Sequence, residues 1–70
     1  MTISYRLFQT SGDHRIEFNG QTYAEDQLHE EIWLVKRELR AGLPKRERIE
    51  AQHQITQYQA LLDALRSAGA

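Results

Sequence analysis

The histidines are the first side chains to consider for chemistry, because imidazole serves both acid–base catalysis and metal binding. His14, His29 and His53 are spread along the chain without the spacing of a ligand set. The stretch that begins at His29, HEEI, superficially follows the helix motif of zinc proteases, but no second histidine stands four residues on. Glu25 precedes His29 by four residues, so a surface ion pair is the better interpretation.

The other reactive side chains also lack partners at a useful spacing. No motif surrounds Ser4, Ser11 or Ser67, and the glycines form no phosphate-binding loop. The sequence contains no cysteine, which excludes disulfides and the usual zinc frameworks. Because catalysis needs convergent groups of tuned pKa, we expect no enzymatic activity, no metal and no cofactor.

Length and composition limit the class of protein. The 70 residues suffice for one domain, and a chain of this length buries only about 60% of the surface that its unfolded form exposes. Small domains often gain stability from disulfides, a metal or oligomerisation, and self-association is the leading candidate here. The net charge of −1 argues against a dedicated non-specific nucleic-acid binder. We find neither a signal peptide nor a stretch of about 18 apolar residues, and therefore expect a cytoplasmic protein that does not bind a membrane.

The N-terminal part of the chain predicts a β-hairpin over about 2–20. Side chains alternate over 2–8 and 15–18, and Gly12 can supply the positive φ of the turn between them. Asn19-Gly20 could form a second turn and a third strand, but a capping box of Thr22 and Glu25 favours a helix start, with any third strand one or two residues long. We expect the apolar face of the hairpin to cover the helices through Ile3, Tyr5, Leu7, Ile16 and Phe18.

Two antiparallel helices are predicted for the rest of the chain, over about 23–41 and about 44–67. Gly42 suits the end of the first helix and Pro44 the start of the second, so a short connection places them side by side. Both helices carry apolar stripes at a spacing of three and four residues: Leu28, Ile32, Val35 and Leu39, then Ala51, Ile55, Tyr58, Leu62 and Leu65. The predicted fold class is α+β, an N-terminal β-hairpin followed by an antiparallel two-helix hairpin (ββαα).

Two large apolar residues of the first helix lie outside its stripe. Trp33 and Leu34 fall about 140° and 120° from the stripe centre, on opposite sides of the back face. One β-hairpin could cover one of them but not both, so we expect at least one to meet another chain. Exposed tryptophan beside arginine is typical of binding hot spots, and Arg37 lies one helical turn from Trp33.

Six of the nine basic residues lie between positions 36 and 48, at the turn between the helices. Bases at the end of the first helix complement its dipole, whereas bases at the start of the second do not. The cluster is a candidate contact for an acidic protein surface or for phosphates, with a solvated tip as the alternative; it contains no aromatic residue to stack on bases. The predicted site residues are Trp33, Leu34, Arg37, Arg40, Lys45, Arg46 and Arg48.

The stretch from Gly12 to Phe18, GDHRIEF, leads into a helix that carries Leu28, Ile32 and Leu39. Over less than half of the chain, this pattern resembles the hairpin-then-helix half of small phage head–tail joining proteins. The chain departs from that family because no helix precedes the hairpin and a second helix follows. The resemblance implies a structural role as an assembly adaptor.

A surface that folding does not use, in a chain without catalytic residues, predicts a protein-binding function. We expect a homodimeric regulator or inhibitor that occludes a surface of a larger protein. A phage-type assembly adaptor is the alternative. Nucleic-acid binding through the basic turn is the less favoured interpretation.

Overall fold

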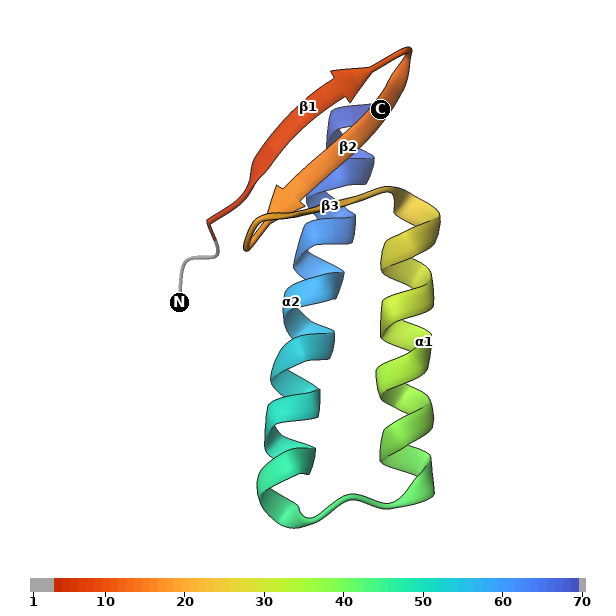
Figure 1. Ribbon diagram of the computed structural model, residues 1–70, viewed down its shortest axis with the longest axis vertical. Helices are drawn as coiled ribbons and strands as arrows, with labels where there is room; N and C mark the ends of the chain where they lie inside the picture. The colour runs from red at the N-terminus through yellow and green to blue at the C-terminus, as the bar shows by residue number, and fades with distance from the viewer. Residues whose placement is uncertain (1–3, 70) are drawn as a thin grey trace.

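The computed structural model describes residues 4–69 and shows a three-stranded antiparallel sheet followed by two antiparallel helices (Figure 1). The predicted α+β class and the ββαα order are confirmed, with one strand added to the hairpin. The molecule is elongated, 41 Å in its longest dimension, because the helices extend well beyond the sheet. The elements are β1 (Arg6–Thr10), β2 (Asp13–Phe18), β3 (Gln21–Tyr23), α1 (Glu25–Ala41) and α2 (Lys45–Gly69).

Both connections within the sheet are two-residue turns with positive φ at each position. The φ angles are 51° and 85° at Ser11 and Gly12, and 52° and 78° at Asn19 and Gly20. Two consecutive positive φ angles define a type I′ turn, whose twist matches that of the flanking strands. The turn predicted at Gly12 is confirmed. Asn19-Gly20 forms the second turn and leads into β3, whose three residues exceed the one or two predicted.

The predicted capping box of Thr22 and Glu25 is wrong. Thr22 lies in β3 opposite Glu17, so its backbone is extended, and α1 begins two residues later than predicted. Ala24 occupies the N-cap position, where its backbone N–H donates to Oε1 of Gln27 at 2.8 Å. The strand prevails because the Asn-Gly turn directs the chain back along β2, while Gln27 supplies an acceptor at the new helix start.

The first turn predicts a stabilising substitution. Ser11→Asn should raise the free energy of unfolding by about 0.5 kcal/mol, because asparagine tolerates a positive φ better than serine does. The second turn supplies the reciprocal control, since Asn19→Ser should lower it by a similar amount. Urea titration monitored by circular dichroism measures both changes. Equal stability of Ser11→Asn and wild type would contradict a positive φ at position 11.

The core lies between the two helices and the inner face of the sheet. Ile16, Leu28 and Leu61 have no exposed surface, and Ile32, Leu62 and Leu65 complete the buried cluster. The two predicted apolar stripes therefore do face each other. Leu61, adjacent in sequence to the α2 stripe, widens the buried surface of α2 enough to serve both α1 and the sheet.

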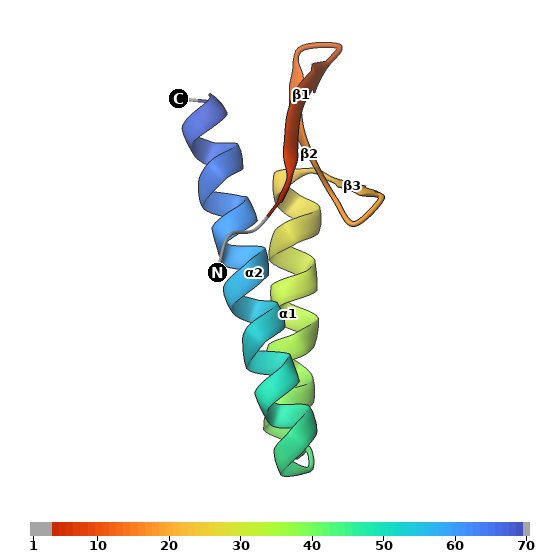
Figure 2. The same ribbon diagram turned by 90° about the vertical axis from the view of Figure 1, so that its left-hand side faces the viewer.

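The prediction that the hairpin covers the helices is only partly right. Ile16 is buried and Phe18 packs against the core, but Tyr5 and Leu7 are exposed, and Ile3 lies outside the described residues. β2 is the strand that packs against α2, and β1 forms an outer edge of the sheet. The β1–β2 hairpin also reaches past the N-terminal end of α1 (Figure 2), so part of its inner face has no helix beneath it.

The helix ends follow the sequence signals to within two residues. Gly42 has φ 100° and ψ 117°, which confirms a positive φ but lies outside the left-handed helical region, and its N–H donates to the Leu39 carbonyl at 3.3 Å. The Pro44 carbonyl accepts from the Arg48 N–H at 2.9 Å, so Pro44 precedes the first residue of α2. α2 ends at Gly69, two residues later than predicted.

Candidate functional site

The side of α1 turned away from α2 carries the predicted binding residues of the first helix. α1 bounds the molecule on this side, and neither α2 nor a strand lies over it (Figure 1). At 100° per residue, the exposed residues opposite the buried stripe fall within an arc of about 120°. We call this surface the α1 outer face: Asp26, Glu30, Trp33, Leu34, Arg37, Arg40 and Ala41.

Trp33 and Leu34 remain exposed at the centre of the α1 outer face, with 55% and 38% of their surface accessible. The alternative in which the β-hairpin covers one of them is not realised, because the sheet packs against α2. The guanidinium of Arg37 lies 5.6 Å from the centroid of the Trp33 ring, within the range of a cation–π contact. This contact holds a large apolar ring and a cation together on the surface.

The charges of the α1 outer face are separated along the helix. Asp26 and Glu30 lie on the N-terminal side of Trp33, and Arg37 and Arg40 lie on its C-terminal side. The helix dipole is a structural reason for Asp26 and Arg40, which lie in the first and last turns of α1. The result is an apolar centre with an acidic half and a basic half.

The basic cluster lies at the end of the molecule opposite the sheet (Figure 1). Three of its residues come from the last turns of α1 and three from the first turn of α2, so the short connection brings them to one end. All are exposed, and the ion pairs of residues 4–69 include none of them. We call this surface the basic end: Lys36, Arg37, Arg40, Lys45, Arg46 and Arg48.

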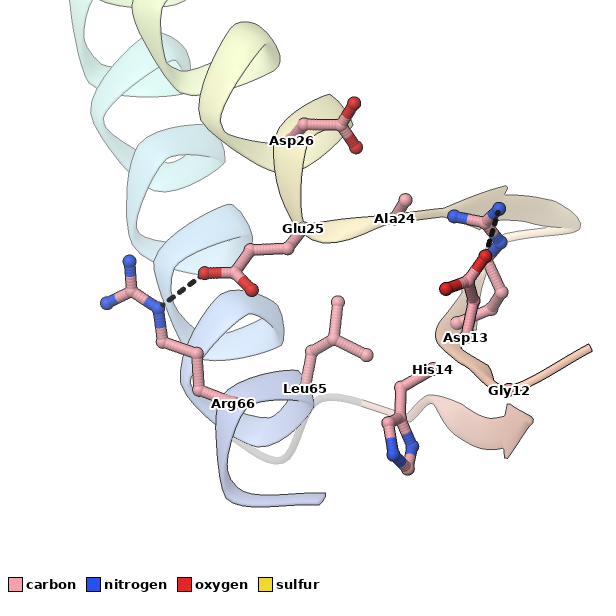
Figure 3. A pocket seen from close by; sticks show the side chains of 9 residues that line it. Gly12, Asp13, His14, Ala24, Glu25, Asp26, Leu65 and Arg66 are labelled. Carbon is pink, nitrogen blue, oxygen red and sulfur yellow. Dashed lines mark hydrogen bonds and ion pairs between the residues drawn. The ribbon is translucent and has the colours of Figure 1, made fainter. Parts of the chain in front are cut away.

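A cleft of about 600 Å³ lies at the other end of the molecule, between the first sheet turn, the start of α1 and the end of α2 (Figure 3). The sequence did not predict it, because its walls come from distant parts of the chain. Its charged groups are largely paired: Arg66 Nε lies 3.1 Å from Glu25 Oε1, and Arg15 lies 3.8 Å from Asp13. The Asp26 carboxylate is turned away from Arg66.

His29 extends the ion pair between the two helices. Its Nε2 lies 3.1 Å from a terminal nitrogen of Arg66 and 3.9 Å from Glu25. Because a guanidinium only donates, this contact is a hydrogen bond in the tautomer whose Nε2 accepts. The predicted Glu25–His29 pair is thus the longer contact of a cluster that fastens α1 to α2. Within residues 4–69, no three His, Cys, Asp or Glu side chains are placed to hold a metal ion.

Tyr58 is a half-buried side chain of α2. Burial raises the pKa of Tyr58, and the neighbouring Tyr23 and Glu31 act in the same direction. The rings of Tyr23 and Tyr58 meet edge to face, with centroids 6.0 Å apart. Both rings pack against the core cluster, so the shift belongs to packing between β3 and α2.

No helix of residues 4–69 is long and apolar enough to cross a membrane. No protein-family model, curated protein or solved structure matches the chain. The resemblance to phage head–tail joining proteins therefore stays a prediction, and the case for function depends on the surfaces described above.

Proposed function

We propose that the protein is a non-enzymatic, cytoplasmic protein-binding module that acts through the α1 outer face and forms a homodimer. The exposure of Trp33 carries this proposal. A tryptophan that is more than half exposed, beside Leu34 and beneath Arg37, is an unusual use of a helix surface unless another protein covers it.

The composition of the α1 outer face favours a protein partner over a nucleic acid. Asp26 and Glu30 would repel phosphates along half of its length. The basic end lacks aromatic side chains on which bases could stack, so we assign it a second, electrostatic contact with an acidic protein surface.

A rigid helix suits a regulator or inhibitor that blocks a surface of a larger protein. The core residues Leu28, Ile32 and Val35 hold α1 from its inner side, so its outer face is ordered before binding. Binding then loses little conformational entropy, and Trp33 can fill a pocket on the partner. This arrangement needs no cofactor and no chemistry.

Trp33→Ala tests the proposal. The variant should associate at least about tenfold more weakly, because it removes the largest apolar side chain of the α1 outer face. Light scattering over a concentration series measures self-association, and a pull-down compares capture of other partners. Far-ultraviolet circular dichroism should stay unchanged, since the core does not include Trp33.

Ile49→Ala is the matched control. Ile49 is half exposed, as Trp33 is, but it lies on α2, outside the α1 outer face. Its replacement should leave association within about twofold of wild type. The proposal fails if Trp33→Ala and wild type behave alike in both binding assays, or if Ile49→Ala has the larger effect.

A further inference from the structure

We propose that the protein covering the α1 outer face is a second copy of this chain, with the two α1 helices antiparallel about a twofold axis beside Trp33 and Leu34. This inference rests on the proposed function and specifies its partner and register. In this arrangement Glu30 of each copy meets Arg37 of the other, and Trp33 of each copy meets Leu34 of the other.

The position of Trp33 is the first observation. α1 has 17 residues, Glu25–Ala41, so eight precede Trp33 and eight follow it. A twofold axis beside the middle of a helix allows the two copies to overlap over the full length of α1, about 25 Å at 1.5 Å per residue. An axis elsewhere would leave one end of each helix without a partner.

The charge order is the second observation. Turning one helix end over end about this axis brings residue 30 opposite residue 37 and residue 26 opposite residue 41, the neighbour of Arg40. Glu30 then faces Arg37, and Asp26 lies beside Arg40, so the acidic half of each copy meets the basic half of the other. The register places no like charges of the α1 outer face opposite each other.

The charge order also excludes a parallel arrangement of the two α1 helices. A parallel twofold pair would place each residue opposite itself, and Asp26, Glu30, Arg37 and Arg40 would all face like charges. Such juxtapositions disfavour association strongly. The α1 outer face is therefore self-complementary in the antiparallel sense only.

The surroundings of α1 allow this approach. No helix or strand lies over the side of α1 away from α2 (Figure 1). Glu30 has no ion-pair partner among the described residues, and Arg37 contacts the Trp33 ring and no carboxylate of that part of the chain. Both charges are free to pair between copies.

Two charge reversals test the register. Glu30→Arg and Arg37→Glu should each weaken self-association by about tenfold or more, because each change puts like charges at two symmetry-related contacts. An equimolar mixture should associate as tightly as wild type, since every altered contact then joins opposite charges. Sedimentation velocity at matched concentrations measures all three samples, and circular dichroism checks that each variant is folded.

Cross-linking of engineered cysteines measures the register independently, because a cysteine removes one charge and does not reverse it. Because the sequence has no cysteine, Glu30→Cys and Arg37→Cys each introduce a single thiol. Under mild oxidation, the mixture should form the cross-linked pair faster than either variant alone. Faster cross-linking of Glu30→Cys with itself would overturn the antiparallel register.

The outcomes separate this inference from the proposed function. If wild type self-associates and depends on Trp33, but the mixed reversals do not recover, the register is wrong and the protein-binding function stands. A wild-type monomer across the concentration series would overturn the self-pairing together with the homodimer of the proposed function, and would leave a foreign partner for Trp33. If Trp33→Ala has no effect in either binding assay, the proposed function itself fails.

Discussion

Leu28→Ala should lower the free energy of unfolding by about 3 kcal/mol, because it leaves a cavity in the core. Leu28 has no exposed surface, and its side chain belongs to the buried cluster that joins the sheet to both helices. A natural domain of this size has only roughly 4 to 10 kcal/mol of stability in total. Urea titration followed by far-ultraviolet circular dichroism measures the loss.

Leu34→Ala is the matched control on the same helix. It makes the same chemical change, but Leu34 lies on the α1 outer face and 38% of its surface is exposed. Its stability should stay within about 1 kcal/mol of wild type. If both variants lost the same stability, Leu34 would belong to the core, and the α1 outer face would not be an available surface.

Ile16→Ala should separate the sheet from the helices. Within the described strands, Ile16 is the one residue classed as buried, and β2 is the strand packed against α2. Losing this contact should reduce stability by about 3 kcal/mol, with amide exchange rising in the strands before it rises in α1 and α2. Hydrogen exchange followed by NMR measures the order in which the elements lose protection.

Leu7→Ala supplies the comparison within the sheet. Leu7 lies directly opposite Ile16 in the β1–β2 register, on the same face, but it is 39% exposed. Its removal should change stability by less than about 1 kcal/mol. A larger loss than that of Ile16→Ala would mean that β1, and not β2, attaches the sheet to the helices.

The helices could be predicted because their signals are local. The apolar spacing of α1, the stop at Gly42 and the start at Pro44 act within a few residues, and both helices were predicted to within two residues at each end. The position of Trp33 on the back face followed from the same spacing. The helical periodicity of 100° per residue was therefore enough to predict that Trp33 lies at the centre of the α1 outer face.

The sheet depended on competition between two local patterns. Thr22 and Glu25 fit a capping box, while Asn19-Gly20 fits a hairpin turn, and the helical pattern that follows favours the capping box. Pairing decides the outcome, because β3 extends the sheet and places Tyr23 opposite Ile16. Because that contact joins residues of different strands, it could not be predicted from the sequence around either residue.

The side of the helical hairpin that the sheet covers could not be read from periodicity. Both Trp33 and Leu34 flank the α1 stripe, and the sequence does not say which flank the sheet meets. Leu61 was the available signal, since a large apolar residue beside the α2 stripe indicates a second buried face on α2. The cleft at Glu25 and Arg66 gave no signal, because its residues lie 41 positions apart.

The division of the core between distant segments has a consequence for synthesis. Ile16 and Leu28 leave the ribosome well before Leu61, Leu62 and Leu65, which complete their buried cluster. Because chains emerge from the N-terminus, the sheet and α1 must exist for a time with their apolar faces uncovered. The nascent chain is therefore most exposed to misassociation and to chaperone capture until the second half of α2 has been translated.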